Sequence, residues 1–321
     1  MKNIFKKFLY FFTFLVAANS AAQQLPDYSQ YPSMLWQLNP AYTGTKATID
    51  ARINYRKQWV GFSGAPVANF AGINSRLWKG RIGLGTTMYK DVTGPSERVN
   101  YGFTAAYHLR LPDVEFSIGF GANFNKYTLK GDLMTTHWAS DPAVDLSVTD
   151  FYKTKNAQTG VLLYNDRFHF GLGVMNLIKS KHVFYATDTT KQSSVYYTPH
   201  YYFTCGYNFD ANPDFVWENN LMALTTLAAP ISINYNLRVH YKEKITVGIG
   251  WKLKDAIYLQ AGYLLLKKIQ LIYSYDLGIS SLRKGHSGSH EVMIGYRMDV
   301  HRKRGQYDKS DGFQKQKYHI F

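Results

Sequence analysis

The chain has 321 residues and a formal net charge of +15, with 26 Tyr, 20 Phe and 25 Gly but one Cys. A single cysteine excludes an intrachain disulfide framework, and the many aromatic residues favour strands. A basic chain can bind nucleic acid, but an exported chain, which residues 1–22 predict below, rarely meets any. We therefore expect anionic lipid, lipopolysaccharide or an acidic partner as the counterpart of this charge.

Residues 1–22 predict a secretory signal peptide, which places the rest of the chain outside the cytoplasm. A basic start with three lysines precedes the apolar run FLYFFTFLVAA, and the small residues at 20–22 provide a cleavage site. The apolar run is shorter than the ~20 residues that a membrane-spanning helix needs. No later segment supplies such a run, so we expect that no helix anchors the exported chain.

The rest of the chain alternates apolar and polar residues with a period of two. In residues 115–127, Phe, Ile and Ala occupy positions 116, 118, 120, 122 and 124, whereas Ser, Gly and Asn occupy the odd positions from 117 to 125. This alternation predicts strands with one apolar and one polar face. We count fourteen such runs, which begin near residues 48, 67, 81, 98, 115, 157, 168, 200, 215, 231, 244, 256, 269 and 289.

Two architectures produce strands of this kind. A soluble sandwich turns the apolar faces inward onto a core, whereas an outer-membrane barrel turns them outward onto lipid. Here the polar faces are rich in Gly, Asn and Ser, and aromatic residues bracket the apolar faces, as in the interfacial girdles of a barrel. We therefore predict an all-β, transmembrane outer-membrane β-barrel of about 14 antiparallel strands. We expect an N-terminal periplasmic or plug segment over 23–46, the barrel over 47–298 and a basic periplasmic tail over 299–321.

The connections between the runs are of two kinds. If the chain starts on the inner side, the inner turns are the tight sequences WKG, LPD, ND, DANPD, YKEK and LLKK. The outer connections include VGFSGAP, DVTGPSE, residues 128–156, residues 177–199 and ISSLRKGHSG. Short periplasmic turns and longer extracellular loops are typical of outer-membrane barrels. An even number of strands would then leave both termini in the periplasm.

No motif in the chain carries catalytic or nucleotide chemistry. Four GxG triplets begin at residues 83, 119, 171 and 248, but none extends to GxGxxG at a strand-to-helix junction. We expect these glycines to leave room in the lumen for other side chains or an inserted segment. Cys205 lies on an aromatic strand without an evident base, so a packed thiol is expected. We predict a protein that is not an enzyme and has no cofactor.

Metal sites are also not expected. His286 and His290 are four residues apart, but a metal pair at this spacing requires a helix, and KGHSGSHE runs from a loop into a strand. Asp141, Asp145 and Asp150 in the long outer loop could supply oxygen ligands for calcium. Such acids more often solvate a loop, so we predict no metal.

Fourteen strands enclose a lumen that is too wide for side chains alone to fill. Charged residues on its inner face must be paired or hydrated. We expect water, segment 23–46 or a partner to occupy the remaining space. The residues predicted to face the lumen are Arg52, Arg56, Asn100, His108, Arg238, Glu291 and Arg297.

Three motifs resemble the PorP/SprF family of outer-membrane proteins of the type IX secretion system in Bacteroidetes. They are NPAYTG at 39–44, YRKQWVGFSGAP at 55–66 and SYDLGISSLRKGHSGSHEVMIGY at 274–296. Their order and spacing agree with the family across almost the whole mature chain, whereas the tail after residue 298 has no place in the family pattern. The motif residues proposed for partner binding or barrel closure are Asn39, Pro40, Gly44, Tyr55, Arg56, Trp59, Gly61, Gly64, Pro66, Ser289, His290 and Glu291.

The motifs also carry local expectations. Pro40 should stiffen the approach to the barrel, and Gly44 should permit a sharp turn before the first strand. Trp59 should lie at the membrane interface opposite to the start of that strand. The residues expected to shape the first outer loop are Gly61, Gly64 and Pro66.

The resemblance implies delivery or surface retention of one large secreted protein, such as a gliding adhesin, that carries a C-terminal targeting domain. The partners implied are that protein, periplasmic or lipoprotein components of the machinery, and outer-membrane lipid and lipopolysaccharide, without nucleic acid. The resemblance does not imply that this barrel is the translocation pore.

Two other classes of protein compete with this interpretation. Fourteen-stranded FadL-type channels for small hydrophobic molecules also have an NPA near their start and an N-terminal plug, but they are usually longer and lack the YRKQW and GSHE features. A purely structural barrel that ties the membrane to the periplasmic wall is the third class. In that case, the basic tail would bind a periplasmic protein.

Overall fold

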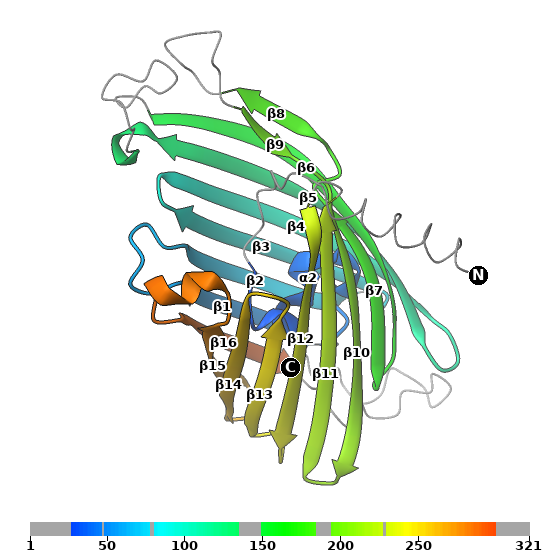
Figure 1. Ribbon diagram of the computed structural model, residues 1–321. Coiled ribbons are helices and arrows are strands. Elements are labelled where there is room, and N and C mark those ends of the chain that lie inside the picture. Colours follow the sequence, from blue (N-terminus) through cyan, green and yellow to red (C-terminus); the bar gives the residue numbers. More distant parts are fainter. Residues whose placement is uncertain are drawn as a thin grey trace, which may run out of the picture.

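The computed structural model describes residues 27–46, 48–77, 80–134, 149–183, 194–226 and 229–299. Its strands form a closed antiparallel barrel, in which the first strand pairs with the second on one side and with the last on the other (Figure 1). The predicted 14-stranded barrel is confirmed. The predicted signal peptide lies outside the described residues, and so does the predicted tail beyond residue 299.

Each of the fourteen predicted runs corresponds to one barrel strand. The barrel strands are β1 (Thr48–Lys57), β2 (Val67–Leu77), β3 (Ile82–Thr93), β4 (Ser96–Arg110), β5 (Glu115–Lys130), β6 (Thr149–Tyr164), β7 (Phe168–Met175), β10 (His200–Asn212), β11 (Phe215–Thr226), β12 (Ala229–Tyr241), β13 (Ile245–Lys252), β14 (Ala256–Leu265), β15 (Ile269–Gly278) and β16 (Ser289–Asp299). Two short strands, β8 (Ser180–Val183) and β9 (Ser194–Tyr197), pair with each other in a separate sheet.

Two of the predicted outer loops were wrong in extent, and a third has the predicted extent but contains strands of its own. DVTGPSE is mostly strand, because β3 and β4 continue until only Gly94 and Pro95 lie between them. The predicted loop 128–156 is shorter at both ends, because β5 and β6 stay paired as far as Lys130 and Thr149. The predicted loop 177–199 contains β8 and β9. In the first two cases, polar residues continue the strands, because backbone pairing with a neighbour does not require an apolar face.

The barrel has two ends that differ in their connections. We call the end where β1 begins and β16 ends the turn end, and the opposite end the loop end. The tight sequences predicted as inner turns join strands at the turn end. The loop end holds the long connections after β1, β5, β7 and β15, with the short helices η4 (Gly131–Leu133) and η5 (Ser281–Gly285). It also holds tight connections after β3, β11 and β13.

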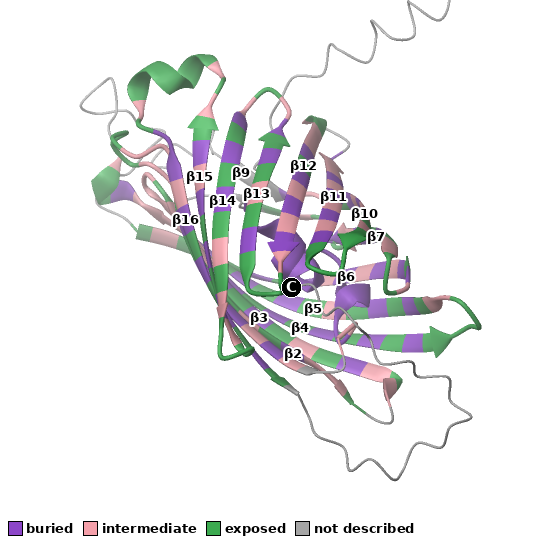
Figure 2. Cartoon of the chain, turned by 90° about the horizontal axis from the view of Figure 1, so that it is seen from below, coloured by how far each residue is buried: buried purple, intermediate pink, exposed green. Residues whose placement is uncertain are grey.

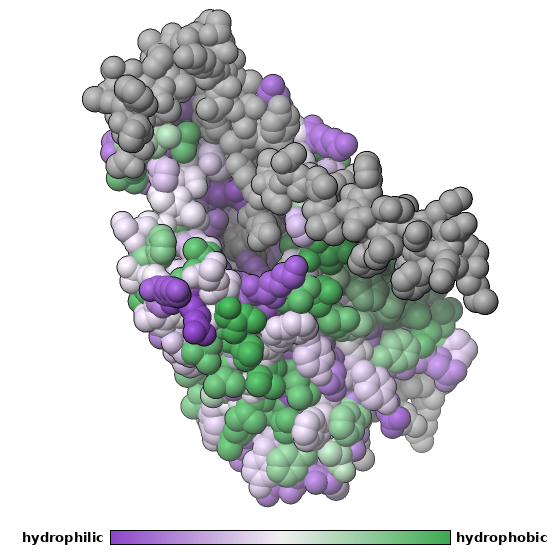
Figure 3. Space-filling model, viewed as in Figure 1, coloured by the Kyte–Doolittle hydropathy of each residue, from purple (hydrophilic) through white to green (hydrophobic). Residues whose placement is uncertain are grey.

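The outer face of the barrel is apolar and the inner face is polar. On β5, the side chains of Phe120 and Phe124 are 59% and 43% exposed, whereas Ser117 and Asn123 are buried. Figure 2 shows this alternation of exposed and buried residues along the strands. Figure 3 shows hydrophobic side chains gathered on the outer wall over strands β10 to β14. An apolar band around a polar interior is the arrangement of a barrel that spans a membrane.

Among the described residues, no helix is both long and apolar enough to cross a membrane. The helices of the N-terminal part are single turns, and they lie inside the barrel (Figure 1). They are η1 (Tyr31–Met34), α2 (Leu35–Leu38) and η2 (Pro40–Tyr42). We call residues 27–46 the plug segment.

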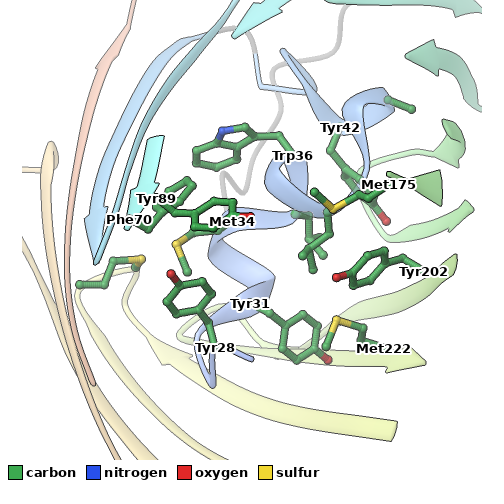
Figure 4. Close-up of a cluster of buried hydrophobic side chains, with 14 of the residues drawn as sticks. Tyr28, Tyr31, Met34, Trp36, Tyr42, Phe70, Tyr89, Met175, Tyr202 and Met222 are labelled. Carbon is green, nitrogen blue, oxygen red and sulfur yellow. The ribbon is translucent and has the colours of Figure 1, made fainter. Parts of the chain in front are cut away.

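The hydrophobic core of the protein surrounds the plug segment. Residues 28–44 are all buried, and the aromatic side chains of Tyr28 and Trp36 contact the wall residue Phe70 with ring centroids 6.4 and 6.2 Å apart. Figure 4 shows these side chains converging with wall residues such as Tyr202 and Met222. The segment predicted over 23–46 therefore fills the lumen along its described part.

Candidate functional site

The NPAYTG motif forms a compact turn that ends the plug segment. Asn39 precedes η2, and its side-chain Oδ1 accepts a hydrogen bond from the Ala41 N–H at 2.9 Å. This bond satisfies a donor that a helix start otherwise leaves free. Pro40 takes the first helical position, where its missing N–H costs little. Gly44 follows with φ of +73°, a conformation that glycine adopts readily.

Glycines of the barrel wall make room for this turn. A Cβ atom on Gly119 would lie 2.2 Å from the nitrogen of Ala41, and one on Gly83 would lie 1.9 Å from the carbonyl oxygen of Thr43. A Cβ atom on Gly160 would lie 2.1 Å from Oδ1 of the motif asparagine. Close-packed interiors tolerate no such overlap. The glycine-rich inner faces are therefore shaped to the backbone of the inserted turn.

Hydrogen bonds hold the turn against the wall. Nε2 of His108 donates to the carbonyl oxygen of Thr43 at 2.9 Å, because a carbonyl oxygen can only accept. The hydroxyl groups of Tyr42 and Thr204 are 2.9 Å apart. Both bonds are buried, where leaving a polar group unpaired costs about 1–3 kcal/mol. The turn is thus fixed to β4 and β10, which three other strands separate in the barrel.

Five charged residues form a cluster at the other end of the plug segment. Arg56 binds Asp276 at 2.7 Å and Glu291 at 2.9 Å, from adjacent strands. Lys252 lies 3.4 Å from Asp276 and 3.1 Å from Asp27 of the plug segment. The four wall side chains are at most 3% exposed. We call these five residues the charge cluster.

The charge cluster binds the main chain of the plug segment directly. The backbone N–H groups of Ser29 and Gln30 donate to the two carboxylate oxygens of Glu291 at 2.8 and 3.2 Å. The Ser29 hydroxyl donates to Asp276 at 2.8 Å and accepts from Arg56 at 3.0 Å. Hydrogen bonds to charged groups are stronger than neutral ones. The cluster therefore positions the start of the plug segment as well as neutralising its own charges.

Two further arginines of the wall contact the middle of the plug segment. Arg238 donates to the Ser33 hydroxyl at 2.9 Å. Arg52 forms an ion pair with Asp50 at 2.8 Å, and its guanidinium lies 6.0 Å from the ring centre of Trp36. At this distance, a cation and an aromatic face attract each other.

The residues predicted to line the lumen all lie on the inner face of the barrel. Asn100 donates to Asn125 at 2.6 Å across β4 and β5. The structure brings Arg56 and Glu291 together but leaves the other five apart from them. All seven side chains are at most 9% exposed: Arg52, Arg56, Asn100, His108, Arg238, Glu291 and Arg297.

The second and third motifs meet where the barrel closes. Arg56 and Glu291 are directly opposite each other in the pairing of β1 with β16, although 235 positions separate them in the chain. Tyr55 and His290 point outward, and Ser289 is buried. The structure therefore places YR of the second motif and HE of the third motif at the seam, where β1 pairs with β16.

The rest of YRKQWVGFSGAP forms the first loop-end connection. Its backbone needs left-handed conformations, with φ of +44° at Trp59, +101° at Gly61 and +71° at Gly64. Pro66 closes the loop, since its carbonyl oxygen accepts from the N–H of Gln58 at 2.9 Å. The loop also packs on the connection before β16, because the N–H of residue 60 donates to the carbonyl of residue 288 at 2.8 Å.

Sequence reasoning missed Ser29, Asp276 and Lys252. Asp276 could have been found, because the alternation along residues 269–277 places it on the polar face. Lys252 ends a run whose inner face carries Gly and Thr, and the same rule applies to it. Ser29 carries no signal, since it lies in an irregular segment without periodicity.

Burial perturbs the titration of side chains in the plug segment. It raises the pKa of Tyr28 and of Tyr31 well above 10.0, and the carboxylate of Glu291 adds to this effect at Tyr28. Both phenols therefore stay protonated, and the Tyr31 hydroxyl donates to a wall carbonyl at 3.1 Å. Burial lowers the pKa of Lys46 to about 8, although the Asp50 carboxylate 3.9 Å away favours the charged form.

Two cavities border the plug segment in the described part of the chain. A cavity of about 140 Å³ near the turn end is lined by residues that include Trp36, Lys46 and Glu218. Another, of about 20 Å³, lies between Tyr31 and Met222. Pockets for drug-sized ligands measure ~300–1,000 Å³, so these cavities suit a few water molecules.

The described part of the chain contains no group of three or more His, Cys, Asp or Glu residues placed to hold an ion. His286 accepts a backbone N–H at 2.9 Å, and Nδ1 of His290 lies 2.7 Å from the Tyr273 hydroxyl. Asp141 and Asp145 lie outside the described residues.

A closed barrel with an apolar outer band, and with its own N-terminal segment packed inside, defines an outer-membrane β-barrel with an internal plug. The family described as "Type IX secretion system membrane protein PorP/SprF" matches residues 20–296. The chain belongs to the PorP/SprF family, as the three motifs predicted. Comparison with curated proteins found no match.

Solved structures with a similar fold include a FadL homologue and a toluene transporter. A FadL homologue of Pseudomonas aeruginosa is 10% identical to this chain, with a TM-score of 0.50. The match covers 82% of this chain and 93% of the homologue. The toluene transporter TodX of Pseudomonas putida is 8% identical over 88% of this chain and 96% of its own, with a TM-score of 0.48. At these identities the likeness concerns the fold alone.

Proposed function

We propose that this barrel assists type IX secretion and anchors one specific large surface protein through the C-terminal targeting domain of that protein. It does so without enzymatic activity or a cofactor. Membership of the PorP/SprF family supports the link to type IX secretion. The observation that carries the proposal is the filled lumen, in which residues 28–44 are all buried. An anchor needs no open pore, whereas a conduit does.

We also propose that the turn end faces the periplasm and the loop end faces the cell exterior. The connections after β1, β5, β7 and β15 at the loop end are longer than any connection at the turn end. This supports the orientation, because outer-membrane barrels keep their turns short on the periplasmic side. Both β1 and β16 have their free ends at the turn end. Periplasmic or lipoprotein components of the secretion machinery would then bind at the turn end, and the secreted partner at the loop end.

Affinity purification of the tagged protein from native outer membranes in mild detergent tests the anchoring role. We expect mass spectrometry to find one very large exported protein in near-equal amount. A barrel that purifies alone would refute the anchor.

Loop variants can locate the contact. Replacing residues 135–146 by a Gly-Ser linker changes the loop end, and replacing Lys242 and Glu243 by Asn and Gly changes only a turn at the opposite end. We expect the first variant to lose the large partner and the second to retain it. Loss from both variants, or from neither, would contradict a contact through the loop after β5.

A FadL-like channel for small hydrophobic molecules is the second candidate. The aromatic and Met-rich core inside the lumen favours it, because such side chains suit an apolar ligand. The filled lumen argues against it unless the plug segment moves. Uptake of a monoaromatic hydrocarbon into liposomes that contain the purified barrel, and its absence from empty liposomes, would support the channel.

A further inference from the structure

Charged side chains on the outer face of the barrel are concentrated on four neighbouring strands. In most described barrel strands, every Lys, Arg, Asp and Glu points into the lumen. Lys57 at the end of β1 points outward, and a larger group does so on β3 to β6. We call this group the lysine face; it consists of Lys90, Glu97, Lys126, Lys130, Lys153 and Lys155.

The strand register brings these lysines into contact range. Lys90 pairs with Val99, Val99 with Lys126, and Lys126 with Lys153, so that one row crosses four strands. Lys126 and Lys153 are directly opposite each other. Like charges in this position destabilise a sheet. Their ammonium groups lie 5.1 and 5.7 Å from the ring of Phe151, which offsets only part of the repulsion.

The lysine face has far more positive than negative charge. Glu97 is its one carboxylate, and it binds Lys90 at 3.1 Å and Lys130 at 3.4 Å. The other three lysines have no carboxylate within 4.0 Å in the described part of the chain. Three exposed ammonium groups are therefore available to an external anion.

The position of the lysine face determines what kind of anion fits it. The next outward residues toward the middle of the barrel are apolar and exposed, such as Tyr101 and Phe124 at the level of Lys155. The face thus lies at the loop-end border of the lipid-facing band. A ligand that covers both surfaces has acyl chains beside the aromatic residues and phosphate groups beside the lysines. This amphipathic combination describes a membrane lipid better than an acidic protein.

We infer that the lysine face binds the phosphate groups of lipid A, the anionic glycolipid of the outer leaflet. The inference rests on the proposed orientation of the barrel, which places the loop end in that leaflet. Phosphate monoesters carry about −1.5 to −2 charges at neutral pH, so one such group between Lys126 and Lys153 would convert their repulsion into attraction. Lysine side chains also extend toward the headgroup level while their stems stay on apolar surface.

Native mass spectrometry of the purified full-length barrel in detergent tests the inference, with diphosphoryl lipid A as the probe. Removing two lysines (Lys126→Gln with Lys153→Gln) should weaken binding roughly 25-fold, since each lysine near an anionic membrane surface contributes a factor of about five. Lys57→Gln, which removes the outward lysine of β1, should change binding less than twofold. Heat-modifiable gel mobility shows whether each variant is folded.

Several results would overturn the inference. Equal binding of dephosphorylated lipid A would exclude phosphate recognition, and equal binding of phosphatidylglycerol would make the face a general anionic surface. Unchanged affinity for lipid A in the double variant would also overturn the inference, and so would capture of an acidic protein in place of lipid. If the double variant does not fold, Lys155→Gln and the loss of binding at high salt test the same point. Because these measurements use the barrel alone, they stay valid if the proposed anchoring role fails.

Discussion

Replacing Arg56 by Met should release the start of the plug segment from the wall. The guanidinium of Arg56 neutralises two carboxylates, those of Asp276 and Glu291, and also binds Ser29. Without it, Lys252 remains as a basic group 3.4 Å from Asp276. Breaking a buried ion pair by removing one partner costs about 3–5 kcal/mol. Each 1.4 kcal/mol changes an equilibrium constant by a factor of ten. The fraction of molecules in which the plug segment is released from the wall should therefore rise about 100- to 4,000-fold.

The released state can be measured by the reactivity of a buried cysteine in the plug segment. Gln37 is 7% exposed and is a suitable position for Gln37→Cys. Cys205, the one cysteine of the chain, is replaced by Ser so that only position 37 can be labelled. The protein with Cys205→Ser and Gln37→Cys is the parent of the variants below. The rate of maleimide labelling at position 37 should increase about 100-fold or more with the Met substitution, in proportion to the released population.

Two controls separate the charge effect from general damage to the barrel. Lys57→Met changes the adjacent outward residue and should leave the labelling rate at the parent value. The triple variant Arg56→Met, Asp276→Asn, Glu291→Gln removes all three charges and should label more slowly than the single variant, because it leaves no unpaired carboxylate. A single variant that labels within threefold of the parent, with its barrel folded, would refute the role of the cluster.

Three other substitutions, one of them with a matched control, test the NPAYTG turn and the titration of Lys46 that follows it. Gly119→Leu should displace the turn and accelerate labelling at position 37, whereas Gly295→Ala, whose Cβ would meet its nearest atom at 3.4 Å, should not. Asn39→Ala should cost about 1 kcal/mol through the lost cap, so labelling should rise about fivefold, and an unchanged rate would show that the cap is dispensable. Partial burial lowers the folded-state pKa of Lys46 to about 8 from 10.5, although its side chain is 25% exposed. Resistance to urea should therefore increase between pH 8 and 10.5, because the folded state loses a partly desolvated charge in this range. Lys46→Met should flatten this increase, and a parent without any pH dependence in that window would contradict the assignment.

Period-two alternation was a reliable guide to the fold, except where polar residues continue a strand. The run predicted from residue 157 begins at Thr149, because Lys153 and Lys155 take outward positions that apolar residues occupy elsewhere. An outward lysine is compatible with a strand near the headgroup level, but it removes the hydrophobic signal. The same lysines form the face for which lipid A is proposed.

The alternation also predicted which face of the barrel each polar side chain occupies. It placed Arg56 and Glu291 inside, and the structure has both fully buried there. It could not predict that they meet, because their pairing depends on closure of β1 against β16. The glycines at 83 and 119 were expected to leave room, but the occupant of that room was left open between other side chains and an inserted segment.

The sequence by itself determined the barrel, the direction in which its side chains point and the family, since all three depend on local periodicity and motif spacing. The contacts between the plug segment and the wall were decided by the tertiary structure. Ser29 has no pattern of its own, and its partners Asp276 and Glu291 lie 247 and 262 positions away. Such contacts arise only when the closed barrel surrounds the segment, because buried charges must then find partners within reach.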